Sequence, residues 1–261
     1  MLAFIEETLR EAGALALSLA AGASAERKED RSLVSEADRE VERLILARLA
    51  RRFPGDPVLA EESGGLAPGA ALSPAGRLWA VDPIDGTNPY LHGLPTWGVA
   101  VGVMREGAPL AGGFFMPAAG EMFLAERGRG ATRNGRPLAP LGPREVDNQT
   151  LFFGPASRKR FYKLDFPGKT VAYGCAAAHV AYAAAGAAFC SVVDRPRLWD
   201  ILGPMAVLAE TGGWAYHPDG RPLGLEGLAR GEKADGPVFF GLRENAERVF
   251  PMLERFEKPR F

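Results

Sequence analysis

Two aspartates three residues apart, Asp82 and Asp85, are the residues of this sequence best placed to do chemistry. They follow an apolar run at 78–81, which is typical of the end of a buried strand. Pro83 fixes its own φ and biases Asp82 towards extended backbone, so both carboxylates are expected to project from a stiff corner. Gly86 permits a ligand to approach the backbone closely. Such a corner suits a hard cation with oxygen ligands.

The residues after this corner predict the beginning of a short helix. Thr87 is a suitable N-cap, and Pro89 suits the first turn. The N–H groups at a helix N-terminus favour a phosphate. The alternative for the two aspartates is turn chemistry, because Asp side chains often bond to their own backbone. A lone D-x-x-D motif favours that alternative, so the assignment depends on acidic partners elsewhere in the chain.

Other acidic residues lie at the ends of predicted elements. Glu61 and Glu62 end a short predicted strand, and Asp200 begins a predicted helix. Each has an ordinary alternative, with Glu62 a solvated acid and Asp200 a helix N-cap. The few histidines and cysteines are scattered, so a zinc site is poorly supported; they are His92, His179, His217, Cys175 and Cys190. Ligation by carboxylate oxygens suits Mg²⁺ or Mn²⁺ instead.

The composition is ordinary for a globular protein and shows no excess of either charge. The 261 residues are 47% apolar and 24% charged, with a formal net charge of -1. Nucleic acid is therefore not expected as a partner. Acids stand near the N-terminus where a signal peptide would be apolar, and the small-residue run 12–25 is too short to span a bilayer. Two cysteines fit a reducing compartment, so we expect a cytoplasmic protein without membrane contact.

The hydrophobic pattern predicts helices and then a largely antiparallel sheet in the first part of the chain. The helices are expected at 2–22 and 36–53, and the strands at 57–60, 78–81, 98–104, 110–116 and 121–126. After residue 146 the pattern mixes both types, with strands at 151–153, 170–172, 189–193, 214–217 and 238–241 and helices at 176–185, 201–211 and 244–256. Two halves, 1–146 and 147–261, are therefore expected.

Taken together, the motifs resemble those of the inositol monophosphatase family of Mg²⁺-dependent, lithium-sensitive phosphomonoesterases. Asp82-Pro83-Ile84-Asp85-Gly86-Thr87 fits its first motif, and Trp199-Asp200 with Ala206, Glu210, Gly212 and Gly213 fits its second. Glu61-Glu62-Ser63 fits the acidic segment before the first motif, and Gly128-Arg129-Gly130-Ala131 with Asn134-Gly135 fits a family hairpin. The resemblance covers nearly the whole chain. It implies an α/β (α+β) fold, a layered αβαβα sandwich with the site between its halves.

The resemblance also implies how two or three Mg²⁺ ions, or Mn²⁺, are held. One ion would be bound by Glu61, Asp82 and the carbonyl of Ile84. A second would be bound by Asp82, Asp85 and Asp200, so that Asp82 bridges the two. A third, looser ion would lean on Glu61, and Glu62 would support the ligands from behind.

The same resemblance implies a catalytic pair and a phosphate cradle. Asp38 and Thr87 would orient and deprotonate the attacking water. Ser35-x-x-Asp38 also fits a helix capping box, which is the alternative for Asp38. The backbone N–H groups of Gly86 and Thr87 would cradle the phosphate.

Substrate contacts are expected at Gly174, Cys175 and Ala176. Inositol-specific relatives carry an acid seven positions before the aspartate of the second motif, where this chain has Val193. The neighbouring Asp194 is the expected surrogate. The basic segment 157–169 is either a contact for a distal substrate group or a solvated loop.

The function that the residues and the resemblance imply is Mg²⁺-dependent hydrolysis of a small sugar or polyol phosphate, similar to inositol 1-phosphate. A homodimer is also expected. Fructose 1,6-bisphosphate, 3′-phosphoadenosine 5′-phosphate and histidinol phosphate are the alternative substrates. A non-catalytic ligand-binding relative is the alternative of another class.

Overall fold

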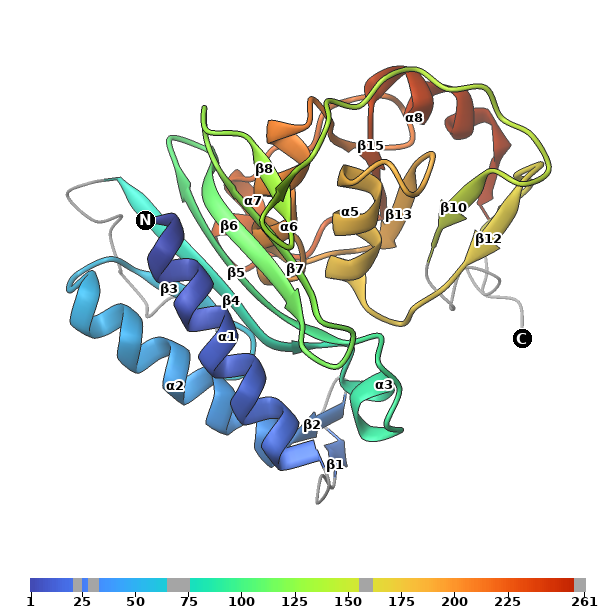
Figure 1. Ribbon diagram of the computed structural model, residues 1–261. Coiled ribbons are helices and arrows are strands. Elements are labelled where there is room, and N and C mark those ends of the chain that lie inside the picture. Colours follow the sequence, from blue (N-terminus) through green and yellow to red (C-terminus); the bar gives the residue numbers. More distant parts are fainter. Residues whose placement is uncertain (21–24, 28–32, 65–75, 155–161, 256–261) are drawn as a thin grey trace.

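Two β-sheets carry the fold, and helices lie on both sides of each sheet (Figure 1). The computed structural model describes residues 1–20, 25–27, 33–64, 76–154 and 162–255. The resulting order of layers is helices, sheet, helices, sheet, helix, as the family resemblance implies.

The first sheet has seven strands in the order β3-β4-β5-β6-β7-β8-β9. Their bounds are β3 Val58–Ala60, β4 Arg77–Asp85, β5 Gly98–Arg105, β6 Ala108–Met116, β7 Glu121–Glu126, β8 Ala131–Arg133 and β9 Arg136–Pro137. β3 pairs parallel with β4, and every later neighbour is antiparallel. The hairpin predicted at Asn134-Gly135 joins β8 to β9, and both turn residues have positive φ, which is typical of a tight two-residue turn.

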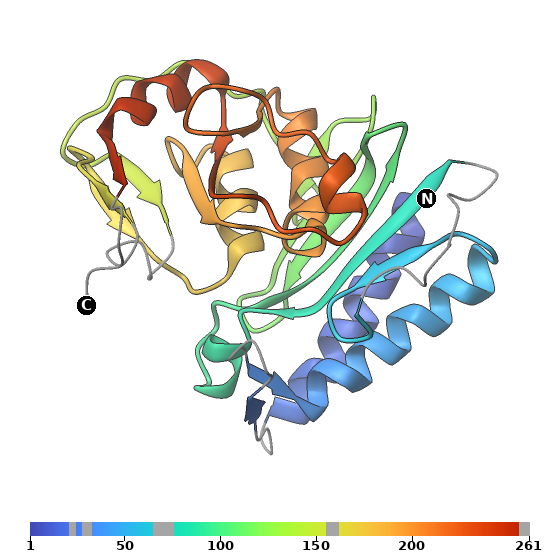
Figure 2. The ribbon, with the colours of Figure 1, turned by 180° about the vertical axis from the view of Figure 1, so that it is seen from behind.

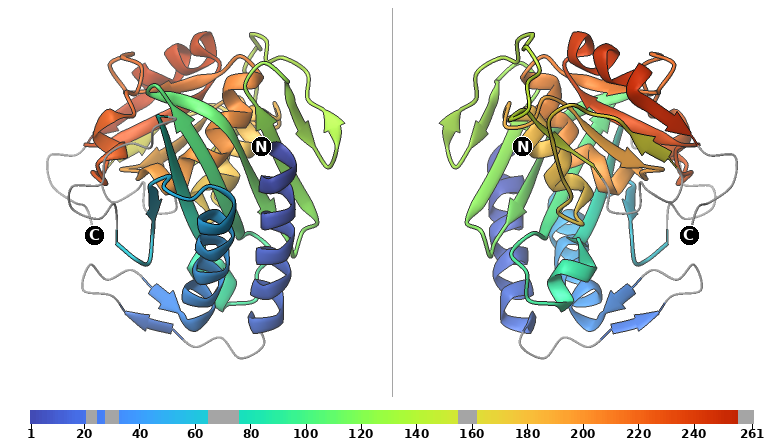
Figure 3. Two further views of the ribbon diagram at one scale, coloured as in Figure 1. Left: turned by 90° about the vertical axis from the view of Figure 1, so that its left-hand side faces the viewer. Right: turned by 90° about the vertical axis from the view of Figure 1, so that its right-hand side faces the viewer.

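Helices α1 (Leu2–Leu19) and α2 (Glu36–Arg52) cover the outer face of this sheet. Figure 3 shows the two helices side by side. Alternate residues of β5 divide between the two faces, since Val99 and Val101 belong to the cluster under α1 and α2 whereas Ala100 belongs to the cluster on the other face. Both faces of the sheet are therefore buried.

The inner face of the first sheet packs against α5 (Ala176–Ala184) and α6 (Leu198–Glu210). Glycines bring α6 into backbone contact with the sheet. A Cβ atom at Gly203 of α6 would lie 2.5 Å from the carbonyl oxygen of Gly113, and a Cβ at Gly102 would lie 2.7 Å from the nitrogen of Gly203. The position of α6, and of the residues at its beginning, is thus fixed by close packing.

The second sheet lies on the far side of α5 and α6 and has five strands in the order β12-β10-β13-β15-β14. Their bounds are β10 Leu151–Phe153, β12 Lys169–Val171, β13 Ser191–Asp194, β14 Trp214–Tyr216 and β15 Pro237–Gly241. Helix α8 (Arg243–Val249) covers its outer face. The chain passes from one sheet to the other between β9 and β10, and the division into halves at residue 147 stays a prediction.

Short elements complete the described chain: β1 Ala25–Arg27, β2 Leu33–Ser35, α3 Thr87–Leu91, β11 Tyr162–Leu164, α7 Glu226–Ala229, the 3-10 turn η2 Phe250–Met252 and β16 Leu253–Arg255. In the ranges described, no helix is both long and apolar enough to cross a membrane.

Several predicted boundaries are wrong. The helix expected at 2–22 ends at Leu19, and the one expected at 244–256 ends at Val249 because Pro251 cannot continue it. The strand expected at 189–193 runs from Ser191 to Asp194. Of the basic segment 157–169, residues 157–161 lie outside the described residues, and Lys169 begins β12 rather than ending a loop.

Candidate active site

Strand β4 carries Asp82 and Asp85 into the interior of the protein. It does not end at Val81, as expected, but continues to Asp85. Its pairing with β5 shifts register between the two aspartates, and Pro83, which has no N–H for the ladder, lies in this irregular stretch. Asp82 and Asp85 are 2% and 9% exposed. The predicted corner is therefore a bulged strand end with two buried carboxylates.

The turn after β4 depends on Gly86. Gly86 is the N-cap of α3 with φ of +90°, so the expectation that Thr87 is the N-cap is wrong. A Cβ at Gly86 would lie 3.1 Å from the Cβ of Cys175, in addition to the strain of the positive φ. Thr87 is the first helical residue, and its hydroxyl donates to the carbonyl of Ile84 at 3.3 Å.

The beginning of α5 meets this turn from the other side of the site. The N–H of Ala176 donates to Oδ1 of Asp85 at 3.1 Å, and the N–H of Ala177 donates to Oδ2. Charge-assisted bonds to backbone N–H groups at a helix N-terminus stabilise a carboxylate. The segment expected to contact substrate, Gly174 to Ala176, thus lies at the site, with the Ala176 amide bonded to Asp85.

Asp200 enters from α6. It is the third residue of that helix rather than its N-cap, and its Oδ2 accepts the N–H of Arg197 at 2.7 Å. Arg197 is the N-cap residue, and its guanidinium lies 5.0 Å from the ring centroid of Trp199.

Burial and the charges of neighbouring acids raise the pKa values of the acids at the site. Burial raises the pKa of Asp82 well above its usual value, and the charges of Glu61, Asp85, Asp200 and Asp38 raise it further. Burial and the charge of Asp85 raise the pKa of Asp200 to about 7, although Arg197 and Lys233 oppose the shift. Burial raises the pKa of Asp85 to about 6 against the N–H bonds of α5. Asp82 and the four acids whose charges act on it are therefore electrostatic neighbours.

This arrangement fits a divalent cation. The Oδ1 atom of Asp82 is buried and has no hydrogen-bond partner among the described residues. Such an oxygen is costly unless something positive binds it. Among the same residues, no three Asp, Glu, His or Cys side chains form a ready-made metal cage. Asp38, Asp85 and Asp200 instead accept bonds from backbone N–H groups. Mg²⁺ keeps several waters and so needs only a few carboxylates.

The capping box predicted at Ser35 and Asp38 is confirmed. The N–H and hydroxyl of Ser35 donate to Oδ2 of Asp38 at 2.7 and 2.6 Å, and the N–H of Asp38 donates to the Ser35 hydroxyl at 3.4 Å. Asp38 is fully buried, and its charge raises the pKa of Asp82. Asp38 therefore caps α2 and also faces the acidic site.

One acid that bears on the site was missed in the sequence. Glu42 of α2 accepts the N–H groups of Glu62 and Ser63 at 2.7 and 2.8 Å. In the view from behind, α2 runs alongside β3, which leads into that turn (Figure 2). The available signal was its position four residues after Asp38, on the same side of the helix.

The structure places Val193 and its expected surrogate, Asp194, on different faces of β13. Val193 is buried in the cluster around α5 and α6, whereas Val192 belongs to the cluster under α8. Because successive strand residues face opposite sides, Asp194 shares the face of Val192 and not that of Val193. The cysteines are free and buried, and the ring of His179 accepts the N–H of Tyr173 at 3.0 Å, in line with structural roles.

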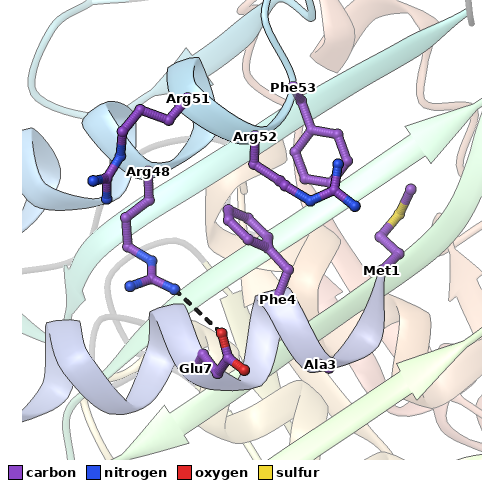
Figure 4. Close-up of a pocket in the computed structure, with 8 residues that line it drawn as sticks. All are labelled: Met1, Ala3, Phe4, Glu7, Arg48, Arg51, Arg52 and Phe53. Carbon is purple, nitrogen blue, oxygen red and sulfur yellow. Dashed lines mark ion pairs between the residues drawn. The ribbon is translucent and has the colours of Figure 1, made fainter.

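A hollow of about 700 Å³ lies between the beginning of α1 and the end of α2 (Figure 4). Its lining includes Phe4, Phe53 and three arginines, Arg48, Arg51 and Arg52. Arg48 forms an ion pair with Glu7 at 3.6 Å, and Arg51 and Arg52 lie in the last turn of α2, where cations offset the helix dipole. The hollow lies near the beginning of β4, away from the acidic site at its end.

Known proteins resemble the chain over most of its length. The sequence pattern of the inositol monophosphatase family matches residues 1–252. A histidinol-phosphatase of Chlorobaculum parvum is 32% identical over 235 residues, which cover 85% of this chain and 87% of the relative. A fructose-1,6-bisphosphatase/inositol-1-monophosphatase of Thermotoga maritima is 31% identical over 194 residues, 70% of each chain.

Solved structures agree with the sequence relatives. The inositol monophosphatase of Anabaena (Nostoc) superposes with a TM-score of 0.77 at 26% identity, covering 98% of this chain and 96% of that one. The resemblance seen in the motifs is thereby confirmed over the whole chain, and with it the layered fold. The chain belongs to the inositol monophosphatase family.

Proposed function

We propose that this protein is a Mg²⁺-dependent phosphomonoesterase that hydrolyses a small sugar or polyol phosphate similar to inositol 1-phosphate. The observation that carries the proposal is the buried group of acids around Asp82, whose mutual repulsion a divalent cation would relieve. Membership of a phosphatase family supports the same class of reaction.

In this proposal the ligands are those that the resemblance implies. Glu61, Asp82 and the Ile84 carbonyl would hold one ion, and Asp82, Asp85 and Asp200 would hold another. Bound Mg²⁺ supplies Lewis-acid chemistry, since it neutralises the phosphate, lowers the pKa of water and stabilises the leaving alkoxide. Mn²⁺ is the alternative ion.

The chain's own groups then orient the reactants. The Thr87 hydroxyl and the Asp38 carboxylate hold the attacking water and accept its proton, as a general base does. The N–H groups of Gly86 and Thr87 face the phosphate oxygens. Because α3 has only five residues, this contact relies on the two N–H donors rather than on a long helix dipole.

A bisphosphate such as fructose 1,6-bisphosphate is the second candidate substrate. A relative named fructose-1,6-bisphosphatase/inositol-1-monophosphatase supports this candidate. Histidinol phosphate stays an alternative, because two relatives carry the name histidinol-phosphatase.

Release of inorganic phosphate from a panel of esters tests the proposal. Inositol 1-phosphate, fructose 1,6-bisphosphate, 3′-phosphoadenosine 5′-phosphate, histidinol phosphate and glycerol phosphate are compared with Mg²⁺ and with chelator. We expect release only with Mg²⁺, and inhibition by Li⁺. No release from any ester would contradict the proposal and favour a non-catalytic ligand-binding relative. We also propose that the protein is cytoplasmic and forms a homodimer. Light scattering of the purified protein measures the molar mass and so tests the homodimer.

A further inference from the structure

Glu42 is a buried carboxylate that lies outside the expected ligand set. It stands four residues after Asp38 on α2 and is 4% exposed. Residues four apart lie on the same side of a helix, so α2 presents two buried acids together. A buried charge is costly unless it is hydrogen-bonded, which makes the partners of Glu42 informative.

Both carboxylate oxygens of Glu42 bind one turn of the chain. Oε2 accepts the N–H of Glu62 at 2.7 Å, and Oε1 accepts the N–H of Ser63 at 2.8 Å. The residue just before these two donors is Glu61, whose own N–H donates to the carbonyl of Val81 at 3.2 Å. Glu61 is therefore fixed on one side by β4, next to Asp82, and on the other side by Glu42.

Packing of α2 does not require an acid at this position. Val41 and Ile45 are fully buried and anchor the helix to the first sheet. A carboxylate, however, offers two converging acceptors to two successive N–H donors, which neither an apolar side chain nor an amide can do. The chemistry of Glu42 thus matches the turn that it holds.

We propose that Glu42 is a positioning residue that sets the carboxylate of Glu61 for the divalent cation. This inference rests on the proposed function, because it takes Glu61 as a metal ligand. Groups that hold a ligand from behind typically change metal affinity about 10–100-fold when they are removed. The chemical step with metal bound does not involve Glu42.

The test compares Glu42→Gln with a matched control, Glu40→Gln, which makes the same change at an exposed Arg43 ion pair on the same helix. Binding of MgCl₂ alone is measured by calorimetry, and phosphate release is measured across Mg²⁺ concentrations. We expect Glu42→Gln to weaken Mg²⁺ binding about 10–100-fold and to regain wild-type kcat at saturating Mg²⁺. Glu40→Gln should match the wild type.

Three outcomes would overturn the inference. Unchanged Mg²⁺ affinity in folded Glu42→Gln would remove the positioning role, while wild-type binding would leave the proposed function intact. A loss of kcat that no Mg²⁺ concentration restores would assign Glu42 a structural role only. A wild type that neither binds Mg²⁺ nor releases phosphate would overturn the proposed function itself.

A measurement on the wild type does not depend on the variant folding. The Glu62 and Ser63 amides should exchange slowly with solvent without Mg²⁺ because Glu42 binds both, and the Glu61 side-chain resonances should shift when Mg²⁺ is added. Fast exchange at both amides would contradict the role of Glu42.

Discussion

The carboxylate of Asp85 accepts the N–H of Ala176 at 3.1 Å, which joins two positions 91 residues apart in the chain. Asp85 ends a strand of the first sheet, and Ala176 begins a helix that leads to the second. The bond therefore joins β4 of the first sheet to the beginning of α5 at the acidic site. Any ion bound by Asp85 would act on both.

The raised pKa of Asp200 predicts that, without metal, stability falls as pH rises. The folded-state pKa of about 7 exceeds the unfolded value near 3.8, so the folded state binds more protons between those values. The contribution of Asp200 to the free energy of unfolding is fully present below pH 4 and is lost as the pH rises through 7. Thermal unfolding in chelator should show Asp200→Asn more stable than the wild type at pH 8, with the difference vanishing near pH 4.

Added Mg²⁺ should make the wild type more stable than Asp200→Asn at pH 8, because Mg²⁺ stabilises only the chain that retains the carboxylate. A difference in melting temperature that does not depend on pH would contradict the assignment of the charge to Asp200.

The Thr87 hydroxyl is expected to serve the chemical step. Thr87→Ala should lower kcat by about 10²–10⁴-fold with little change in Mg²⁺ affinity, whereas Thr87→Ser should keep most activity because it retains the hydroxyl. Steady-state kinetics on the best ester of the panel measure both. If KM rises and kcat holds, Thr87 binds substrate and does not activate water.

Gly203 is expected to be intolerant of any side chain. A Cβ there would meet the carbonyl oxygen of Gly113 at 2.5 Å, so α6 would have to move away from the sheet. Overpacking of this kind costs about 1–3 kcal/mol. Chemical denaturation of Gly203→Ala measures the loss of unfolding free energy, with Gly142→Ala as the control because a Cβ at Gly142 meets nothing within 4 Å. Equal stability of the two variants would contradict the close packing.

Val193 at the expected substrate-contact position predicts an enzyme that discriminates little between small phosphate esters. A site without a polar partner for a substrate hydroxyl forgoes about 1.5–3 kcal/mol, or roughly 10- to 150-fold in discrimination. We therefore expect similar kcat/KM for inositol phosphate and glycerol phosphate. Asp194→Ala should leave that ratio unchanged, since Asp194 lies on the other face of β13 from Val193. A wild type selective by more than about a thousandfold would place the specificity contacts elsewhere.

Much of the first sheet could be predicted from the sequence. Its strands show the alternating side-chain pattern that is typical of β-strands, and the turns between them contain Gly and Asn. The acids of the site could be found from their motifs. The N-caps of the two helices at the site could not be predicted. Thr87 and Asp200 are both suitable N-caps by residue type, but the N-caps in the structure are Gly86 and Arg197. The preference of a residue type does not decide between adjacent positions when tertiary packing fixes the chain.

The partners of the acids also lay beyond the sequence. The bonds from Ala176 to Asp85 and from Glu62 to Glu42 use backbone N–H groups, which every residue but proline has. Nothing in a residue's type shows which distant carboxylate its N–H will meet. Glu42 in particular reads as one more charged residue of an amphipathic helix.

The most direct test of the account is a Mg²⁺ titration of phosphate release by the wild type and by Asp82→Asn, with circular dichroism to show that both are folded. Asp82 is the carboxylate expected to bridge two ions, and the change removes a charge without opening a cavity. We expect release by the wild type that rises with Mg²⁺ and is abolished by chelator, and no release by Asp82→Asn at ordinary Mg²⁺. Near-normal turnover by folded Asp82→Asn would contradict the two-metal site.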